Sequence, residues 1–314
     1  MSIPLQERFR GCLLGLAIGD ALGGRFEAQS AENIRRRFPS VEHLINYVTD
    51  DSWYTDDTQM AIGVSEVLAN HGEILEEHLC RAFVENYDPS RGYGLGARRV
   101  LNAMEAGRDH KAVAARHFPG GSYGNGAAMR VAPIGIYFRN YPDIVLQQSR
   151  LSAIPTHVHP FGIEGAQLIA AAVAEASRID EFDRDSFFAN LLYRCESSEF
   201  RSKMTMASTI INASDLPQLG NGIEALESVP TAIACFALSP NSYSQTIANA
   251  IFLGGDTDTI AAMSGAISGA MLGMAGIPES LLEHLEETPK GRAYILELAD
   301  RLFRSHRSNE SIAD

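Results

Sequence analysis

Two short acidic segments, far apart in the chain, place the strongest constraint on its fold. Residues 54–58 read Tyr-Thr-Asp-Asp-Thr and residues 254–259 read Gly-Gly-Asp-Thr-Asp-Thr, about 200 positions later. Each segment precedes a stretch in which apolar residues recur at helical spacing. An Asp or Thr in that position often serves only as an N-cap, which satisfies free N–H groups of the first turn. One cap uses one such residue, whereas each segment offers at least three oxygen ligands.

Neighbouring carboxylates repel one another and are costly to desolvate, so a buried set usually holds a cation. Neither segment contains Cys or His, and oxygen ligands of this kind suit Mg²⁺ or Mn²⁺ rather than Zn²⁺. We therefore expect one split metal site. If both segments contribute to it, the chain must close into a single unit.

Helical periodicity runs through nearly the whole sequence, and alanine is frequent within it, which predicts an all-α protein. Residues 44–48 form the only plausible strand, and a weak one. No fixed repeat and no low-complexity linker divides the chain. We expect one domain over residues 1–306 and a polar C-terminal tail over residues 307–314. The expected helices are 5–18, 60–69, 75–87, 97–106, 144–153, 162–177, 187–195, 204–213, 231–238, 244–253, 259–274 and 292–304.

The charge balance narrows the classes of partner. The 26 basic and 39 acidic residues of this 314-residue chain give a formal charge of −13, without a visible basic run. This argues against binding to nucleic-acid backbone or to anionic membranes. A small anionic ligand remains compatible, because helix N-termini and glycine-rich backbone bind phosphate without Lys or Arg.

Cysteine usage and the one uncharged segment both favour a soluble protein. The four cysteines are isolated, which predicts buried reduced thiols in a cytoplasmic compartment: Cys12, Cys80, Cys195 and Cys235. Residues 259–277 lack charge and carry glycines at four-residue spacing, as some membrane helices do. Two aspartates just before that segment, and few Leu, Val or Phe within it, favour a buried helix that a second helix approaches closely.

Two glycine-rich segments, residues 91–96 and 120–126, each precede a helix. Neither follows a strand, so a Rossmann fingerprint is not supported. The first segment, residues 91–96, is as consistent with an ordinary turn as with a ligand-binding loop. The second combines glycines with Ser122, Tyr123 and Asn125, and this composition predicts a nest for a phosphorylated ligand that carries a ring.

The spacing of residues alone does not decide the roles of Glu27 and of the pair His157 and His159. Glu27 follows the glycines of the first helix, where a lone loop glutamate is normally a solvated charge. His157 and His159 lie between Pro155 and Pro160, and this turn favours a hydrogen-bonding or ligand-contacting His157 over a zinc site.

Taken together and in this order, residues 11–27, 54–58, 124–130 and 254–261 resemble the motifs of the ADP-ribosylglycohydrolase family, and the resemblance covers most of the chain. Residues 91–96, 121–125 and 219–233 resemble most the ADP-ribosylhydrolase 3 branch, the serine-ADP-ribose hydrolases. Two details depart from that pattern. The loop between Phe118 and Ser122 is one residue shorter, and His159-Pro160 stands where small polar residues are usual.

The resemblance implies an all-α fold with two Mg²⁺ ions at the bottom of a cleft. It implies metal ligands at Thr55, Asp56, Asp57, Asp256, Asp258 and Thr259, and a mobile flap glutamate at Glu27 that also reaches the metals. It implies an ADP-ribose pocket lined by Gly92, Phe118, Gly121, Ser122, Tyr123, Gly124, Asn125, His157 and Ile223.

The implied reaction is hydrolysis of the bond between the anomeric carbon of ADP-ribose and an acceptor oxygen. Serine-linked ADP-ribose is the expected substrate, with poly-ADP-ribose or O-acetyl-ADP-ribose as further ones. Either Glu27, or Asp258 through a bound water, moves the proton. Three alternatives stay open: an ADP-ribosyl-arginine hydrolase, a catalytically silent structural or binding protein, and a metal phosphohydrolase. We expect a monomer whose partners are ADP-ribosylated proteins.

Overall fold

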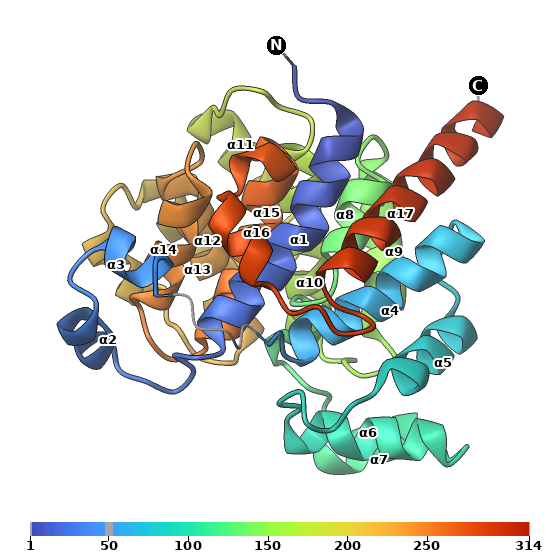
Figure 1. The fold of residues 1–314 in the computed structure, drawn as a ribbon. Coiled ribbons are helices and arrows are strands. Elements are labelled where there is room, and N and C mark those ends of the chain that lie inside the picture. Colours follow the sequence, from blue (N-terminus) through green and yellow to red (C-terminus); the bar gives the residue numbers. More distant parts are fainter. Residues whose placement is uncertain (1, 48–52, 314) are drawn as a thin grey trace.

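The computed structural model describes residues 2–47 and 53–313, and helices dominate them throughout (Figure 1). The described residues form no sheet; two isolated bridges join Ser30 to Gly254 and Gly124 to Glu224. The predicted all-α class is therefore confirmed. The α-helices are α1 Leu5–Gly23, α2 Ala31–Arg37, α3 Val41–Ile45, α4 Asp56–His71, α5 Glu76–Asn86, α6 Leu95–Glu105, α7 His110–His117, α8 Ala132–Tyr137, α9 Pro142–Ala153, α10 Pro160–Ala176, α11 Arg184–Tyr193, α12 Ser198–Thr209, α13 Ala225–Leu238, α14 Tyr243–Ile251, α15 Thr257–Leu272, α16 Glu279–His284 and α17 Arg292–Ala313.

The predicted strand over residues 44–48 is wrong. Leu44 and Ile45 belong to helix α3. Ser40 is the N-cap of this helix, and its side chain accepts a hydrogen bond from the backbone N–H of His43. Leu44 and Ile45 are buried on one side of this short helix. Five helical residues are too few for a 3.6-residue period to be visible in sequence. Val48 lies outside the described residues.

The last helix is longer than expected, since α17 continues past residue 304 to Ala313. Polar contacts accompany the extension: the side-chain amide of Asn309 donates to the hydroxyl of Tyr137 at 2.8 Å. A search for apolar spacing does not detect contacts of this kind. Four more short helices, α2, α7, α8 and α16, were also missed by the sequence periodicity.

Helices α1 and α15 pack against each other in the centre of the molecule, and glycines let their backbones touch (Figure 1). A Cβ atom on Gly11 would collide with the carbonyl oxygen of Gly269, and one on Gly19 with that of Ala261. The two helices are therefore antiparallel, and the predicted close helix approach is confirmed. This packing brings the end of α1 beside the beginning of α15, where the second acidic segment lies.

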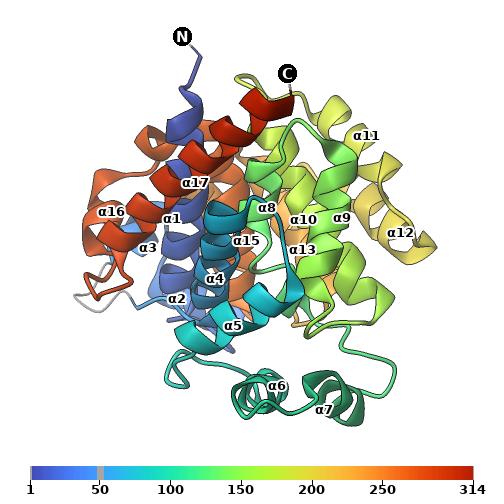
Figure 2. The ribbon, with the colours of Figure 1, turned by 90° about the vertical axis from the view of Figure 1, so that its right-hand side faces the viewer.

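The core is formed by helices that are buried on almost every side, above all α10 and α15. Although α15 is largely apolar, none of the described helices is both long and apolar enough to span a membrane. Helices α6 and α7 lie side by side at one edge, below α4 and α5 in Figure 2.

Candidate metal and ligand-binding site

The first acidic segment forms the start of α4. Thr55 is the N-cap, and its hydroxyl accepts a hydrogen bond from the backbone N–H of Asp57 at 3.4 Å. Capping thus occupies one residue of the segment. Asp57 is 2% exposed, and its Oδ1 atom has no hydrogen-bond partner. A buried carboxylate oxygen without a donor is costly unless a cation compensates it.

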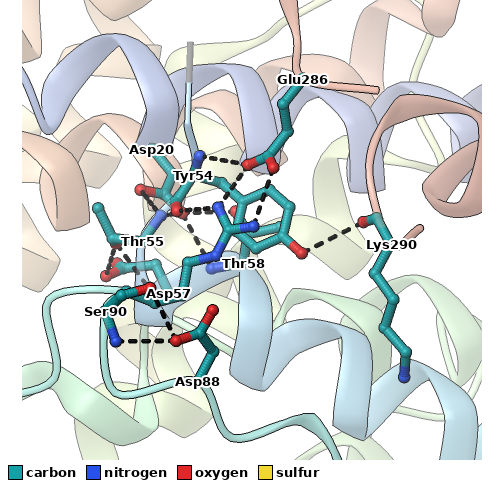
Figure 3. A network of polar contacts seen from close by, with 10 residues as sticks. Asp20, Tyr54, Thr55, Asp57, Thr58, Asp88, Ser90, Glu286 and Lys290 are labelled. Atoms are coloured by element: carbon teal, nitrogen blue, oxygen red, sulfur yellow. Dashed lines mark hydrogen bonds and ion pairs between the residues drawn. The ribbon is translucent and has the colours of Figure 1, made fainter. Parts of the chain in front are cut away.

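Asp20, near the end of α1, holds this segment in place (Figure 3). Its carboxylate accepts the backbone N–H groups of Thr55 and Thr58, each at 3.0 Å, and the hydroxyl of Thr58 at 2.5 Å. Asp20 is fully buried. Its role was not predicted from the sequence. The available signal was a charged residue inside a helix of small and apolar residues, where an unpaired charge is unfavourable.

A second support for the segment comes from the loop before α17. The carboxylate of Glu286 accepts the backbone N–H of Tyr54 and forms an ion pair with Arg91, whose guanidinium also donates to the carbonyl of Tyr54 (Figure 3). The hydroxyl of Tyr54 donates to the carbonyl of Lys290 at 3.3 Å. The residue before the N-cap is thus fixed by both backbone and side chain.

The second acidic segment is shaped by Gly254 and Gly255, whose φ angles of +67° and +77° suit glycine. The N–H of Gly255 donates to the carbonyl of Gln29 at 3.0 Å, and its own carbonyl accepts from the N–H of Ala28 at 2.8 Å. The loop after α1, which contains Glu27, is thereby tied to the turn before α15.

Asp256 is held by two asparagines. The side-chain amide of Asn125 donates to Asp256 Oδ2 at 2.5 Å, and the backbone N–H of Asp256 donates to the carbonyl of Asn221 at 2.9 Å. The side chain of Asn221 in turn donates to the carbonyls of Leu253 and Gly254. Asp256 occupies the N-cap position of α15, but its side chain makes no capping hydrogen bond. Its carboxylate is therefore turned to other partners.

Three carboxylates meet at this end of the molecule. One oxygen each of Glu27, Asp256 and Asp258 lie within 4.8 Å of one another. Asp256 and Asp258 are buried, whereas Glu27 is exposed, and Asp258 Oδ1 has no hydrogen-bond partner. Oxygens at such separations can share one cation.

Burial, together with repulsion between neighbouring carboxylates, raises the pKa values of the acidic groups in the site. Burial, then the charge of Asp258, raises the pKa of Asp20 to about 7. Burial, followed by the neighbouring charges of Asp20 and Asp258, raises the pKa of Asp56 to about 7. Burial likewise raises the pKa values of Asp57 and Asp256 well above their usual range. The pKa of Glu27 is also raised, first because its carboxylate is partly desolvated although the residue as a whole is exposed, and then by the charge of Asp258.

These residues fit a divalent cation by their chemistry. The ligand atoms are carboxylate and hydroxyl oxygens, which Mg²⁺ and Mn²⁺ prefer. The two partnerless oxygens on Asp57 and Asp258, together with the raised pKa values of the neighbouring carboxyls, fit a site whose residues are compensated by a cation.

A cavity of about 410 Å³ opens above the carboxylates. Its lining brings together most of the residues expected from the resemblance: Glu27, Asp56, Asp57, Gly92, Phe118, Ser122, Asn125, His157, Ile223, Asp256, Asp258 and Thr259. These residues come from the loop after α1, the starts of α4 and α15, and four other segments. The structure thus brings the two acidic segments to one cavity.

Four of the expected site residues lie beside the cavity lining rather than in it. Thr55 lines an adjoining pocket next to Trp53 and Arg91. Gly121 packs against Val158 and His159, and Tyr123 is half exposed with its ring edge-on to His159 at 5.7 Å. Gly124 forms the bridge to Glu224 that closes the nest.

His157 is half-buried in the cavity wall, and its Nδ1 atom lies 2.7 Å from the hydroxyl of Thr156. Burial, then the nearby guanidinium of Arg130, lowers the pKa of His157 to about 3, so its imidazole is neutral. His159 instead caps α10 by accepting the backbone N–H of Phe161 at 3.1 Å. The two histidines therefore have different hydrogen-bond partners.

Arg130 ends the segment 124–130, and no role was predicted for it from the sequence. It is almost fully buried, stacks on Phe83 and donates to the carbonyls of Gly126 and Ser152 and to the hydroxyl of Thr156. It therefore links the glycine-rich nest to the turn that carries His157.

Comparison with known proteins agrees with this geometry. The model of the ADP-ribosylglycohydrolase family matches residues 1–311. The chain belongs to the ADP-ribosylglycohydrolase family. It is 35% identical to human ADP-ribosylhydrolase ARH3 over 89% of each chain, and 34% identical to the zebrafish (Danio rerio) protein of that name over 88% of this chain and 86% of that one.

Other relatives of the family cover still more of the chain. An uncharacterized protein of Archaeoglobus fulgidus is 33% identical over 96% of this chain and 98% of its own. A solved structure titled "ADP-ribosylglycohydrolase-related protein complex" superposes with a TM-score of 0.74 at 26% identity, over 96% of this chain and 99% of that one. The family expected from the motifs is therefore confirmed.

Proposed function

We propose that this protein is a Mg²⁺-dependent ADP-ribosylhydrolase that cleaves the O-glycosidic bond between ADP-ribose and an acceptor, with serine-linked ADP-ribose as its substrate. The observation that carries the proposal is the cavity floor. Asp57 and Asp258 lie far apart in the chain but line the same 410 Å³ cavity, and each has a buried oxygen without a donor. The relatives named ADP-ribosylhydrolase support the choice of substrate class.

The site would hold two Mg²⁺ ions, with Mn²⁺ as a substitute, through two groups of residues. Thr55, Asp56 and Asp57 belong to the first group, and Asp256, Asp258 and Thr259 to the second. When bound, such ions supply positive charge that orients ribose hydroxyls and lowers the pKa of water. Asp20 fixes the first group through the N–H groups of α4, and Asn125 fixes Asp256.

The remaining walls suit the two ends of ADP-ribose. In the nest over residues 121–125, the N–H groups of Gly121, Gly124 and Asn125 already donate within the protein, which leaves those of Ser122 and Tyr123 for the diphosphate. Phe118 offers a ring face to the adenine. A neutral His157 can donate or accept one hydrogen bond without competing for the metal charge. Ile223 is 69% exposed and can cover bound ligand from the rim.

Proton transfer falls to Glu27 or Asp258. The raised pKa of Glu27 keeps it closer to neutrality than an ordinary surface glutamate, which suits a general acid–base group. Asp258 would act through a bound water. The loop after α1 is tied to the turn before α15 at Ala28 and Gly255, so the two candidates remain neighbours.

The test is incubation with serine-linked and arginine-linked ADP-ribosyl peptides, each with Mg²⁺ and with excess chelator. We expect free ADP-ribose from the serine-linked peptide only, and only with metal. Release from the arginine-linked peptide alone would contradict the O-glycoside assignment. AMP as the product would identify a phosphohydrolase, and binding of ADP-ribose without turnover would identify a silent family member.

A further inference from the structure

A second group of metal-ligand side chains lies between α5 and α7, away from the acidic cavity floor. Glu76 and Cys80 are one helical turn apart on α5, and His110 is the first residue of α7. One ligand atom from each of these three residues lies within 4.8 Å of the other two. All three residues are half-buried, so they are accessible to an ion yet held by their helices.

From this arrangement we propose a transition-metal site, occupied by Zn²⁺, that joins α7 to α5 through Glu76, Cys80 and His110. Zn²⁺ takes thiolate, imidazole and carboxylate ligands in tetrahedral geometry, and this trio supplies one of each. A fourth position is left for water. The proposal is independent of the function assigned to the acidic cavity.

The distances are close to those that such an ion requires. His110 Nε2 lies 3.9 Å from Cys80 Sγ and 3.9 Å from a carboxylate oxygen of Glu76. Metal–ligand bonds of about 2.0–2.3 Å in a tetrahedron separate the ligand atoms by about 3.4–3.6 Å. Small side-chain rotations therefore complete the site, with no change in the helices.

The chemistry of the trio separates it from the Mg²⁺ site. Burial lowers the pKa of His110, which leaves a neutral imidazole able to bind metal. Burial raises the pKa of the Cys80 thiol to about 11, so an ion must displace its proton. Zn²⁺ and Co²⁺ have the thiolate affinity to do so, whereas Mg²⁺ does not.

One neighbouring group competes with the ion. The ammonium of Lys111 lies 2.6 Å from a carboxylate oxygen of Glu76, and its side chain is half exposed. Exposed ion pairs of this kind contribute about 0–1 kcal/mol, well below the affinity of a three-ligand metal site. Removing Lys111 should consequently strengthen metal binding.

Occupancy of the site would restrain one wall of the large cavity. Helix α7 buries none of its residues, so little apolar packing holds it. Yet His117 at its end and Phe118 just after it line the cavity, together with Val100 and Leu101 of α6. Figure 2 shows α6 and α7 at the edge of the molecule, next to α5. A metal between α5 and α7 would fasten this edge.

Titration of the full-length protein with Co²⁺ in saturating Mg²⁺ tests the proposal, because cobalt bound to thiolate gives a near-ultraviolet charge-transfer band. No cysteine lines the acidic cavity among the described residues, so Co²⁺ bound there gives no such band. We expect one equivalent of Co²⁺ to produce the band and Zn²⁺ to remove it. Absence of the band in wild-type protein would overturn the site.

Variants assign the ligands. Cys80→Ser should abolish the band, and His110→Ala and Glu76→Gln should each weaken Co²⁺ binding by more than about 10-fold, since even outer partners contribute about 10- to 100-fold. His78→Ala and Glu77→Gln, on the same helix, are the matched controls and should bind Co²⁺ normally. Lys111→Ala should bind more tightly. Unchanged binding by both His110→Ala and Glu76→Gln would refute the assignment, even if Cys80→Ser fails to fold.

Hydrogen exchange measures the structural consequence. In the presence of Mg²⁺, added Zn²⁺ should slow amide exchange in residues 110–118 of wild-type protein and leave His110→Ala unaffected. Equal slowing in both proteins would contradict a bridge through His110.

Discussion

The carboxylate of Asp20 accepts both the backbone N–H and the hydroxyl of Thr58, across 38 positions of sequence. A further bond from the N–H of Thr55 means that one buried side chain on α1 fixes the first turn of α4. Asp20 thus positions the first acidic segment through hydrogen bonds, although Asp20 itself does not line the cavity.

Replacing Asp20 by Asn should misplace that turn. One amide oxygen cannot accept all three donors, and each buried donor left unpaired costs about 1–3 kcal/mol. We expect Asp20→Asn to lower the free energy of unfolding of the Mg²⁺-bound protein by that order and to weaken Mg²⁺ binding measured by calorimetry. Thr58→Val should have a smaller effect in the same direction. Thr58→Ser keeps the hydroxyl and is the control; equal losses in Thr58→Ser and Thr58→Val would argue against the hydrogen bond to Asp20.

Gly19 tests the contact between α1 and α15 that aligns the two acidic segments. A methyl group there would collide with the backbone carbonyl of Ala261, so one helix must shift. Gly19→Ala should destabilise the protein by about 1–3 kcal/mol, as overpacking does, despite the higher helix propensity of alanine. Gly94→Ala is the control, because a Cβ atom at Gly94 meets nothing within 4 Å. Denaturant unfolding compares the two; equal stability would show that the helices tolerate separation.

The sequence was most informative where several side chains able to bind a metal lie within a few residues of one another. Residues 54–58 and 254–259 carried enough oxygen ligands within a few positions to predict a common site, and the structure brings Asp57 and Asp258 to one cavity. The role of Asp20 could not be predicted from the sequence. Its partners are backbone N–H groups and one hydroxyl at the start of α4, and only the fold brings them close to Asp20. Asn125 was predicted to contact ligand, and its observed bond to Asp256 depends on a turn that spacing does not reveal.

Short elements explain the remaining differences in the fold. Helix α3 spans five residues and α7 eight, so neither shows enough apolar repeats to define a period. The juxtaposition of Cys80 and His110 was unpredictable for the same reason. It depends on where α7 lies, and α7 was not expected at all.

The raised carboxyl pKa values predict an unusual pH dependence for metal-free protein. Asp20 and Asp56 have pKa values of about 7 in the folded state, against an ordinary value of 3.8. Between pH 4 and 7 the folded state therefore binds more protons than the unfolded state, so stability falls as the pH rises. Two kinds of group act in the opposite sense. Carboxylates with lowered pKa, such as Asp300, do so mainly below pH 4. The imidazoles of His157 and His110, whose pKa values are lowered from 6.5, do so up to about that pH, but the four carboxyls with raised pKa values in the site outweigh them.

Melting temperatures at pH 5 and pH 7.5, with chelator and with Mg²⁺, check this dependence. With chelator we expect the lower melting temperature at pH 7.5. Added Mg²⁺ should remove the difference, and saturation at about 100-fold over its dissociation constant should add about 2.7 kcal/mol. A chelated protein that is more stable at pH 7.5 than at pH 5 would contradict the assigned site.

If one site uses both acidic segments, changes in either should have the same consequence. Asp57→Asn and Asp256→Asn should each reduce hydrolysis of a serine-linked peptide by orders of magnitude and lower the number or affinity of bound Mg²⁺ ions. Asp215→Asn, in the 3-10 helix Ala213–Gln218 and outside the cavity lining, is the control. Normal turnover and metal content in Asp256→Asn, beside an inactive Asp57→Asn, would show that the segments act separately.

Glu27 is the residue at which catalysis and binding can be separated. Its carboxylate lies with those of Asp256 and Asp258, yet it is exposed and belongs to a loop. If it moves the proton, Glu27→Gln should lower turnover by about 10²–10⁴-fold, the usual worth of general acid–base help. Affinity for ADP-ribose should stay the same or rise, because a neutral amide competes less well for the metal charge. Glu32→Gln, an exposed glutamate on neighbouring α2, is the matched control and should change neither quantity. Calorimetric ADP-ribose binding beside a peptide-hydrolysis assay distinguishes the two roles. Near-normal hydrolysis by Glu27→Gln would remove it from the mechanism and leave Asp258, acting through water, as the proton-transfer group.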